Sequence, residues 1–244
     1  MPNFHWVILS DLHLKTMEEP KAQQLLEFLY SVGQQSQLQG LLFNGDIFEF
    51  CFGGSSYFQQ KFKALGAALV QLAQQGIQII FVEGNHEFYM RHIGWQHPNI
   101  KFLTSAGSTL TLANNTVLRF CHGDSLLAPW HYFFYMRFVR SAWILPIVKL
   151  LPQRLLDQAC LWLASLSRQY NRALNHPFIL SKVKEKILAE PCHIFIMGHF
   201  HYPYTEVLSL PTGKTTRVYC VDSWEKPNCL LVDANSLEIH RHYF

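Results

Sequence analysis

The sequence contains few charged residues, no closely spaced pair of cysteines and no long apolar run. Charged residues make up 15% of the 244 positions, whereas hydrophobic residues make up 49% and aromatic residues 14%. A chain this apolar cannot stay disordered along its length. Its 13 glycines and 11 prolines exclude a collagen-like or linker-type sequence. The formal net charge of +3 does not by itself indicate a protein that binds nucleic acid.

The cysteines and the amino terminus restrict where the protein works. None of the six cysteines forms a CxxC pair, so buried reduced thiols are favoured over a disulfide framework. The first residues, MPNFHWVILSDLH, have no basic start and no small-residue cleavage site, so we expect no signal peptide. No stretch of 18 uncharged apolar residues occurs, so we expect no transmembrane helix. We therefore expect a cytoplasmic protein that touches a membrane only from the side.

Strand-like and helix-like patterns alternate through the first half of the chain. Strands are predicted at residues 4–9, 41–43 and 77–82, and helices at 20–35 and 58–75. This alternation favours a parallel sheet with right-handed crossovers. A hairpin is predicted at 108–121, around Asn114-Asn115, and strands return at 193–242. We expect one α/β domain over residues 1–244, with a helical insertion at about 126–189.

The predicted insertion differs from the remainder of the chain in charge. Residues 126–186 contain nine Lys and Arg but only two acidic residues, whereas the remainder contains 11 basic and 15 acidic residues. The insertion is therefore a basic segment joined to an acidic core. Its aromatic and basic residues are interleaved, which is typical of a helix at the surface of an anionic membrane.

Five predicted strands end in residues that commonly bind metal ions. The segments are Asp11-Leu12-His13, Gly45-Asp46, Gly84-Asn85-His86-Glu87, His122-Gly123-Asp124 and Gly198-His199-Phe200-His201. One such segment occurs easily by chance, but chance gives no reason for five of them to follow the strands. In open α/β sheets ligands bind at this edge. Two divalent ions about 3.5–4 Å apart need a bridging ligand, and the Asp46 carboxylate suits that role.

The order DxH, GD, GNHE, H and GHxH resembles the calcineurin-like metallophosphoesterases. The resemblance implies a four-layer α/β/β/α sandwich of two mixed sheets with a helical cap insertion. It also implies two divalent metal ions, which we expect to be Mn²⁺, with Fe or Zn²⁺ as alternatives. Asp11, His13 and His201 would hold one ion, Asn85, His122 and His199 the other, and Asp46 would bridge them. His86 would protonate the leaving oxygen, Glu49 would orient His86, and Glu87 would support the site.

The segment from His122 to Asn171 resembles, within that family, the UDP-2,3-diacylglucosamine hydrolases of lipid A biosynthesis. HGDxL, an aromatic stretch with Arg, a Leu-Pro and a Ser-Arg-x-x-Asn cluster are shared. The resemblance implies hydrolysis of the pyrophosphate of a lipid-linked nucleotide, which gives UMP and a lipid 1-phosphate. Substrate contacts are expected at Trp130, Arg137, Arg168 and Asn171. The protein would then lie peripherally at the inner face of the cell membrane and would not bind nucleic acid.

Two departures from that family keep alternatives open. His86-Glu87 stands where those hydrolases typically have Arg-Asp, and Pro129-Trp130 replaces acidic residues expected after HGDxL. A phosphodiesterase or phosphatase that acts on a soluble nucleotide or another phosphoester is therefore the second hypothesis. A nucleic-acid binder and a metal-free interaction scaffold are weaker alternatives, because no nucleic-acid motif is present and no expected ligand is missing.

Overall fold

Two β-sheets face each other in the computed structural model, which describes residues 4–112, 115–150, 176–211 and 213–244. The six-stranded sheet contains, in spatial order, β13 (Ile239–Tyr243), β12 (Asn228–Val232), β1 (Trp6–Leu9), β2 (Gly40–Asn44), β4 (Gln78–Val82) and β6 (Ile100–Leu103). The five-stranded sheet contains β10 (Tyr204–Ser209), β11 (Thr215–Cys220), β9 (Ile194–Met197), β8 (Val117–Cys121) and β7 (Ser108–Thr111). A two-stranded sheet pairs β3 (Cys51–Phe52) with β5 (Glu87–Phe88).

Each large sheet combines parallel and antiparallel strands. Strands β1, β2, β4 and β6 run parallel, β12 is antiparallel to β1, and β13 is antiparallel to β12. In the other sheet, β8, β9 and β11 run parallel, with β7 and β10 antiparallel at its edges. The carboxyl ends of the parallel strands lie at one edge of each sheet. That edge is where the sequence places its metal-ligand residue types.

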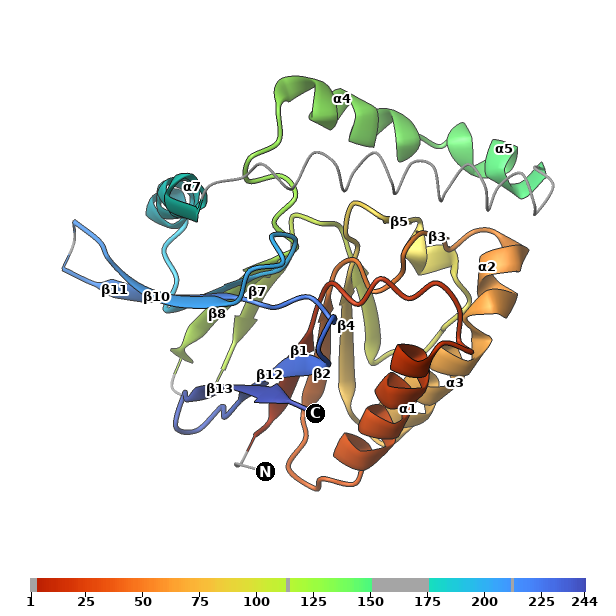
Figure 1. Ribbon diagram of the computed structural model, residues 1–244, viewed down its shortest axis with the longest axis horizontal. Coiled ribbons are helices and arrows are strands. Elements are labelled where there is room, and N and C mark those ends of the chain that lie inside the picture. Colours follow the sequence, from red (N-terminus) through yellow and green to blue (C-terminus); the bar gives the residue numbers. More distant parts are fainter. Residues whose placement is uncertain (1–3, 113–114, 151–175, 212) are drawn as a thin grey trace.

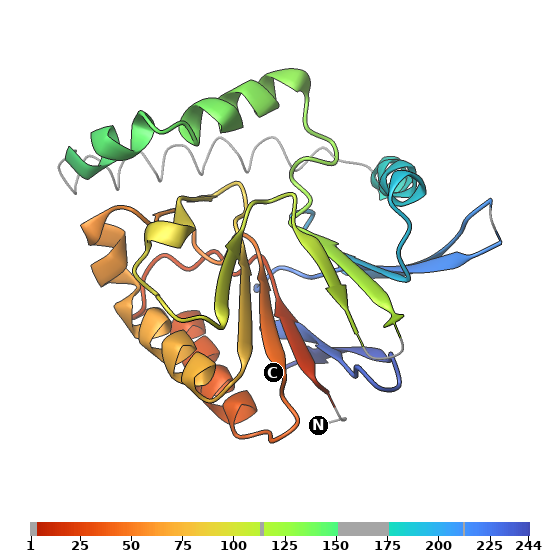
Figure 2. The same ribbon diagram turned by 180° about the vertical axis from the view of Figure 1, so that it is seen from behind.

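The two sheets lie between two layers of helices, so the four-layer fold expected from the sequence is confirmed (Figures 1 and 2). Alternate residues of β1 face different cores: Val7 and Leu9 face the helices α1 (Pro20–Gly33) and α3 (Lys63–Gln74), and Trp6 and Ile8 face the second sheet. Helix α7 (His176–Ala189) covers the outer face of the five-stranded sheet with Ile179, Val183 and Ile187.

The single helix expected at residues 58–75 is wrong, because the chain forms α2 (Ser56–Lys61) and α3 with a break at Phe62. Phe62 has φ −109° and ψ 20°, outside the helical region. Its side chain is completely buried, and its ring centroid lies 4.0 Å from that of Phe48. Core packing of this ring overrides the local helical pattern.

Helices α4 (Trp130–Val139) and α5 (Ile144–Leu150) cross above the two-stranded sheet and the short 3₁₀ helix η1 (Met90–His92), as both views show (Figures 1 and 2). They belong to the insertion expected at 126–189, of which residues 151–175 lie outside the described part. None of the helices in the described ranges has both the length and the apolar character needed to cross a bilayer.

One buried carboxylate ties together the loops that follow β2 and β4. The side chain of Glu87 accepts hydrogen bonds from the main-chain N–H groups of Asp46 at 3.1 Å, Ile47 at 2.7 Å, Phe48 at 3.1 Å and Gly84 at 2.9 Å. Glu87 is completely buried, so these four donors replace the water that the carboxylate loses. The positions of Asp46 and Asn85 thus depend on one side chain.

Replacement of Glu87 by Gln is expected to lower the free energy of unfolding by about 2–3 kcal/mol. The amide keeps the size of the side chain, but its NH₂ group faces main-chain N–H donors, which lose their acceptor. Urea unfolding of chelator-treated protein measures the change. Glu225→Gln on an exposed loop is the matched control, with a change below about 0.5 kcal/mol. Equal stability of the two variants would contradict the role of Glu87.

Candidate metal centre

The side chains that follow five strand ends come together in one cluster. Three groups place ligand atoms within 4.8 Å of one another, and they are Asp11–His13–His201, His13–Asp46–His86 and Asp46–His122–His199. His13 and Asp46 each belong to two groups, so the groups are continuous. The Asn85 Oδ1 atom adjoins them, 3.2 Å from His122 Nε2. The structure thus gathers every metal ligand expected from the sequence.

Asp46 lies at the centre of this cluster. Its Oδ2 atom is 3.3 Å from His122 Nε2 and 3.9 Å from His86 Nε2, and its Oδ1 atom accepts a hydrogen bond from the main-chain N–H of His86 at 3.0 Å. Burial alone would raise the pKa of Asp46, but the neighbouring His122 and His86 hold it well below the usual value. The carboxylate is therefore charged, and both of its oxygens face the cluster.

Asp11 occupies the corresponding position at the end of β1. Its carboxylate accepts hydrogen bonds from Ser10 Oγ at 2.6 Å and from the main-chain N–H of His199 at 3.0 Å, and Asp11 Oδ1 lies 3.3 Å from His201 Nε2. Burial alone would raise the pKa of Asp11, whereas the hydrogen bond and the charge of His201 lower it below the usual value. The His201 side chain is 37% exposed, so this side of the cluster is open to solvent.

The main chain is strained where it carries these side chains. Eight non-glycine residues in the described ranges have positive φ, and five of them are expected ligands: Asp11, His13, Asp46, His199 and His201, with φ between 50° and 70°. A non-glycine residue in this region costs about 1–3 kcal/mol and persists only where the surroundings enforce it. Such strain concentrated in one cluster is typical of a functional site.

The histidines of the cluster differ in the charge they carry. Burial lowers the pKa of His13 to about 3 and that of His199 to about 4, so both are neutral at pH 7. Burial would also lower the pKa of His122, but the adjacent Asp46 raises it to about 10. Neutral imidazoles present the lone pair that a metal ion needs, and a cation bound beside Asp46 would compete with the proton of His122.

The donors of the cluster fit divalent metal ions. The Nδ1 atoms of His13 and His199 are buried without a hydrogen-bond partner. A buried polar atom left alone is costly, and a bound cation would supply the missing partner. Carboxylate, imidazole and amide ligands together suit Mn²⁺, Fe or Zn²⁺. The residues present therefore fit the metals that the sequence predicts.

The imidazole of His86 is oriented by Glu49, though through an atom that the sequence does not reveal. His86 Nδ1 lies 2.7 Å from the main-chain oxygen of Glu49 and donates to it, which directs His86 Nε2 toward Asp46. The contact comes from the main chain rather than from an acidic side chain. Any residue at this position could therefore provide the oxygen.

Two glycines next to the expected ligands permit the close packing of the loops. A Cβ atom at Gly84 would overlap the Asp46 carboxylate, and one at Gly198 would overlap Ser10 Oγ and the Asp11 carboxylate. These positions therefore require glycine because neighbouring main chain and carboxylates occupy the space of a side chain. The approach of the β4 loop to Asp46 depends on Gly84 in particular.

The structure describes two of the four residues that the sequence predicts to contact the substrate. Trp130 and Arg137 lie on α4, exposed to solvent, and the Trp130 ring contacts Phe134 rather than a side chain of the cluster. Arg168 and Asn171 lie outside the described residues. The geometry thus brings neither Trp130 nor Arg137 into contact with the expected ligands.

Sequence reasoning missed two contacts between α4 and the cluster. Tyr132 Oη donates to the Asp124 carboxylate at 2.6 Å, and Arg140 Nη2 donates to the main-chain oxygen of Gly84 at 3.3 Å. Asp124 belongs to the HGD motif, and that motif is a signal that could have indicated a role for it. Nothing in the sequence distinguishes Arg140 from the other basic residues of the insertion.

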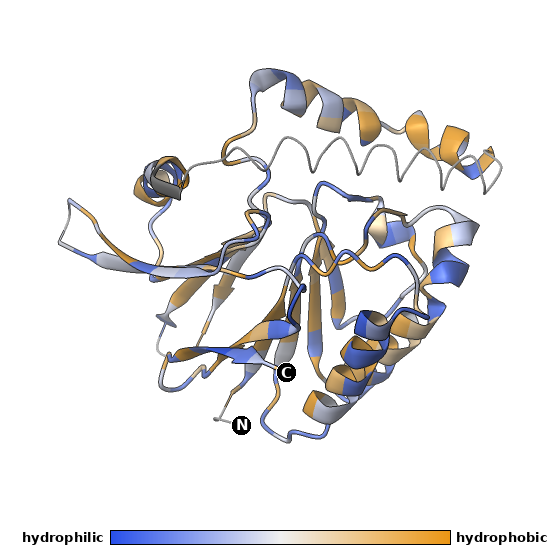
Figure 3. Cartoon of the chain, in the orientation of Figure 1, coloured by the Kyte–Doolittle hydropathy of each residue, from blue (hydrophilic) through white to orange (hydrophobic). Residues whose placement is uncertain are grey.

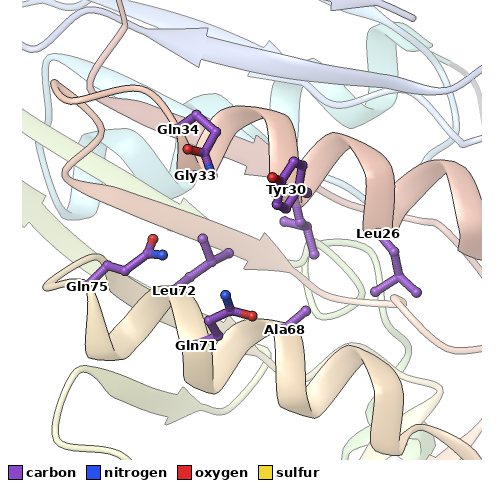
Figure 4. Close-up of a pocket in the computed structure, with 9 residues that line it drawn as sticks. Leu26, Tyr30, Gly33, Gln34, Ala68, Gln71, Leu72 and Gln75 are labelled. Carbon is purple, nitrogen blue, oxygen red and sulfur yellow. The ribbon is translucent and has the colours of Figure 1, made fainter.

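A hollow elsewhere on the molecule lies between α1 and α3 (Figure 4). Its volume is about 210 Å³, and it is lined by leucines, glutamines and the exposed ring of Tyr30. It contains no acidic residue, histidine or basic residue. This hollow therefore lacks the groups needed for metal-dependent hydrolysis.

Comparison with known proteins agrees with this geometry. Residues 4–203 match the calcineurin-like phosphoesterase family. UDP-2,3-diacylglucosamine hydrolase of Vibrio parahaemolyticus is 23% identical over 248 residues, covering 98% of each chain. The protein of the same name from Azotobacter vinelandii is 27% identical over 241 residues, covering 92% of each chain. The solved structure of TT1561 of Thermus thermophilus has a TM-score of 0.50 and 9% identity over 99% of both chains, which is a likeness of fold alone.

The family match includes every strand end that contributes to the cluster, since the last of them, after β9, ends at His201. The resemblance seen in the motifs is thereby confirmed. The chain belongs to the calcineurin-like phosphoesterases and is a metal-dependent hydrolase.

Proposed function

We propose that this protein hydrolyses the pyrophosphate bond of a UDP-2,3-diacylglucosamine-like, lipid-linked nucleotide at a centre of two divalent ions. The observation that carries the proposal is the position of Asp46, whose carboxylate belongs to two adjacent groups of potential ligands. Asp11, His13 and His201 would hold one ion, and Asn85, His122 and His199 would hold the other, with Asp46 able to serve both. Two bound ions supply activation of water and neutralise the charge of the phosphate oxygens.

The remaining steps belong to residues of the chain. His86 lies beside the proposed bridge, with Nδ1 fixed by the main-chain oxygen of Glu49 and Nε2 facing the centre. In this orientation Nε2 can deliver a proton to the leaving phosphate oxygen. The main-chain contact prevents the ring from turning away between turnovers. Glu87 holds the Asp46 loop and so fixes the distance between bridge and acid.

The substrate class rests on the names of the relatives and on the character of α4 and α5. Their hydrophobic residues lie at the margin of the molecule (Figure 3). Trp130, Phe134 and Phe138 form a stripe four residues apart along α4, with exposed fractions of 74%, 67% and 65%. Trp143 on the connection to α5 is 82% exposed. We propose that this surface, the aromatic stripe, meets the acyl chains or the lipid headgroups of the inner face of the cell membrane.

The second hypothesis, a phosphoesterase for a soluble nucleotide, is favoured by one specific observation. His86-Glu87 follows Asn85, whereas the UDP-2,3-diacylglucosamine hydrolases typically have Arg-Asp there. The substitution removes a permanent cation from the centre and replaces it with a group that can transfer a proton. Direct comparison of a lipid-linked nucleotide with its soluble counterpart distinguishes the two hypotheses, because the first requires preference for the lipid-linked form.

Replacement of the proposed bridge, Asp46→Asn, is expected to lower the rate by at least 10³-fold, because a neutral amide binds two cations poorly. The rate is measured with saturating Mn²⁺ on an aryl phosphate and on the lipid-linked substrate. Asp233→Asn is the matched control, since Asp233 follows β12 at the opposite edge of the six-stranded sheet. Near-normal turnover of the Asp46 variant would overturn the two-metal assignment.

Removal of the proposed acid, His86→Ala, is expected to lower turnover while both metal ions stay bound. The loss should be larger for a substrate with a poor leaving group than for p-nitrophenyl phosphate, whose leaving oxygen needs little protonation. Elemental analysis of the purified variant counts the metals. If the variant contained one ion where the unaltered protein contains two, His86 would be a ligand instead.

Substitution in the aromatic stripe, Phe138→Ala with Trp143→Ala, is expected to weaken binding to vesicles that contain phosphatidylglycerol. High salt should weaken binding of the unaltered protein too, since each Lys or Arg near an anionic surface contributes about 1 kcal/mol. Flotation measures the bound fraction, and Tyr30→Ala is the control because Tyr30 is 70% exposed on α1. Absence of vesicle binding by the unaltered protein would refute the membrane proposal.

A further inference from the structure

Near its amino-terminal end, helix α4 is attached by one part-buried hydrogen bond to the loop that carries His122. Tyr132 Oη donates to Asp124 Oδ2 at 2.6 Å, and Asp124 is 5% exposed. Asp124 lies two residues after His122, in the loop that follows β8. Because a hydrogen bond to a charged acceptor in a buried setting is strong, this contact fixes the loop relative to the helix.

The carboxyl-terminal end of α4 is attached to a second loop, the one that follows β4. Arg140 Nη2 lies 3.3 Å from the main-chain oxygen of Gly84 and 3.4 Å from Glu83 Oε2. From the loop, Tyr89 Oη lies 2.9 Å from the main-chain oxygen of Val139 and 2.5 Å from that of Ser141. The segment between these contacts carries Asn85 and His86. It is therefore held by α4 on both sides.

Packing keeps α4 in place between the two attachments. Met136 in its middle is 6% exposed and belongs to the core that also includes Phe52 and Tyr89. Val148 of α5 is 6% exposed in the same core, and a Cβ atom at Gly54 would overlap the Leu145 side chain. The helix is thus packed against the domain between its two attachments.

The two attached loops supply ligands to the same proposed metal position. Asn85 Oδ1 and His122 Nε2 lie 3.2 Å apart, and these residues with His199 form the position shared with Asp46. The hydrogen bonds that the described residues show between α4 and strand-end loops go to Asp124 and to the Glu83–Tyr89 segment. The loop after β1, with Asp11 and His13, receives none of them in that part of the chain.

We infer that α4 is a brace that acts mainly on the metal affinity of one position of the centre, that of Asn85, His122 and His199, and reaches the other position only through the shared Asp46. Tyr132, Tyr89 and Arg140 are positioning residues that act through the two loops. The inference rests on the proposed two-metal function.

Contacts that orient a metal ligand have a measurable effect on metal affinity. Groups that orient a metal ligand without touching the metal typically change metal affinity by about 10–100-fold when they are replaced. The Tyr132–Asp124 bond and the Arg140 contacts each orient one ligand loop. Loss of either should therefore weaken one binding event in a titration more than the other.

The test is calorimetric titration of Mn²⁺ into chelator-treated Tyr132→Phe, Arg140→Gln and Tyr89→Phe proteins. Each variant is expected to show one event weakened by about 10–100-fold and a second event weakened clearly less. Tyr30→Phe on α1 and Arg91→Gln are the matched controls. Arg91 lines the same hollow of about 260 Å³ as Arg140, so its loss reports the effect of charge alone.

Further measurements separate a failure of the brace from a failure of folding or of the proposed function. Urea unfolding checks that the variants fold, and Arg140→Lys, which keeps the charge but loses the planar fork, replaces the glutamine variant if that one does not. High Mn²⁺ should restore hydrolysis of p-nitrophenyl phosphate by the variants. Two unchanged events, or two events weakened equally, would overturn the brace. A single event in the unaltered protein would overturn the proposed function instead.

Discussion

The buried carboxylate of Glu87 is the interaction on which the metal centre depends. Four main-chain N–H groups from two loops converge on it, so the loop with Asp46 and the loop with Asn85 cannot move independently. Burial, and then the charge of Asp46, raise the pKa of Glu87 to about 8, while the hydrogen bonds from Gly84 and Phe48 and the charge of His122 act in the opposite direction. Cations bound at Asp46 would favour the ionised form of Glu87, so folding and metal binding reinforce each other here.

The strained main chain at the ligands follows from the same geometry. At the end of each parallel strand the main chain points away from the sheet. The ligands lie one or two residues later, so the main chain must turn sharply there to direct their side chains toward a common centre. Asp11 and Asp46 do so in the left-handed region, next to glycines whose missing side chains leave room for the carboxylates. The three apolar cores and the parallel ladders offset this cost, which is why strain can be concentrated at one edge of an otherwise regular fold.

The two halves of the centre differ in their surroundings. Asp11, His13 and His201 lie on the side where His201 is open to solvent, whereas His122 and His199 are buried, and α4 covers their neighbouring loops. Helix α4 lies in the range where the sequence predicts an insertion, and its contacts reach two of the loops that carry expected ligands.

The sequence by itself determined most of the longer strands, the fold class and the gathering of the expected ligands, because each depends on local patterns and on the rule that parallel strands end at one edge. It did not determine the break at Phe62, the short strand β6, or the main-chain oxygen of Glu49 that orients His86. Nor did it reveal the contact of Arg140 with Gly84, which is 56 residues away in the chain. These features arise from packing between segments that are distant in the chain. The hydrophobic pattern of one segment does not show which other segment packs against it.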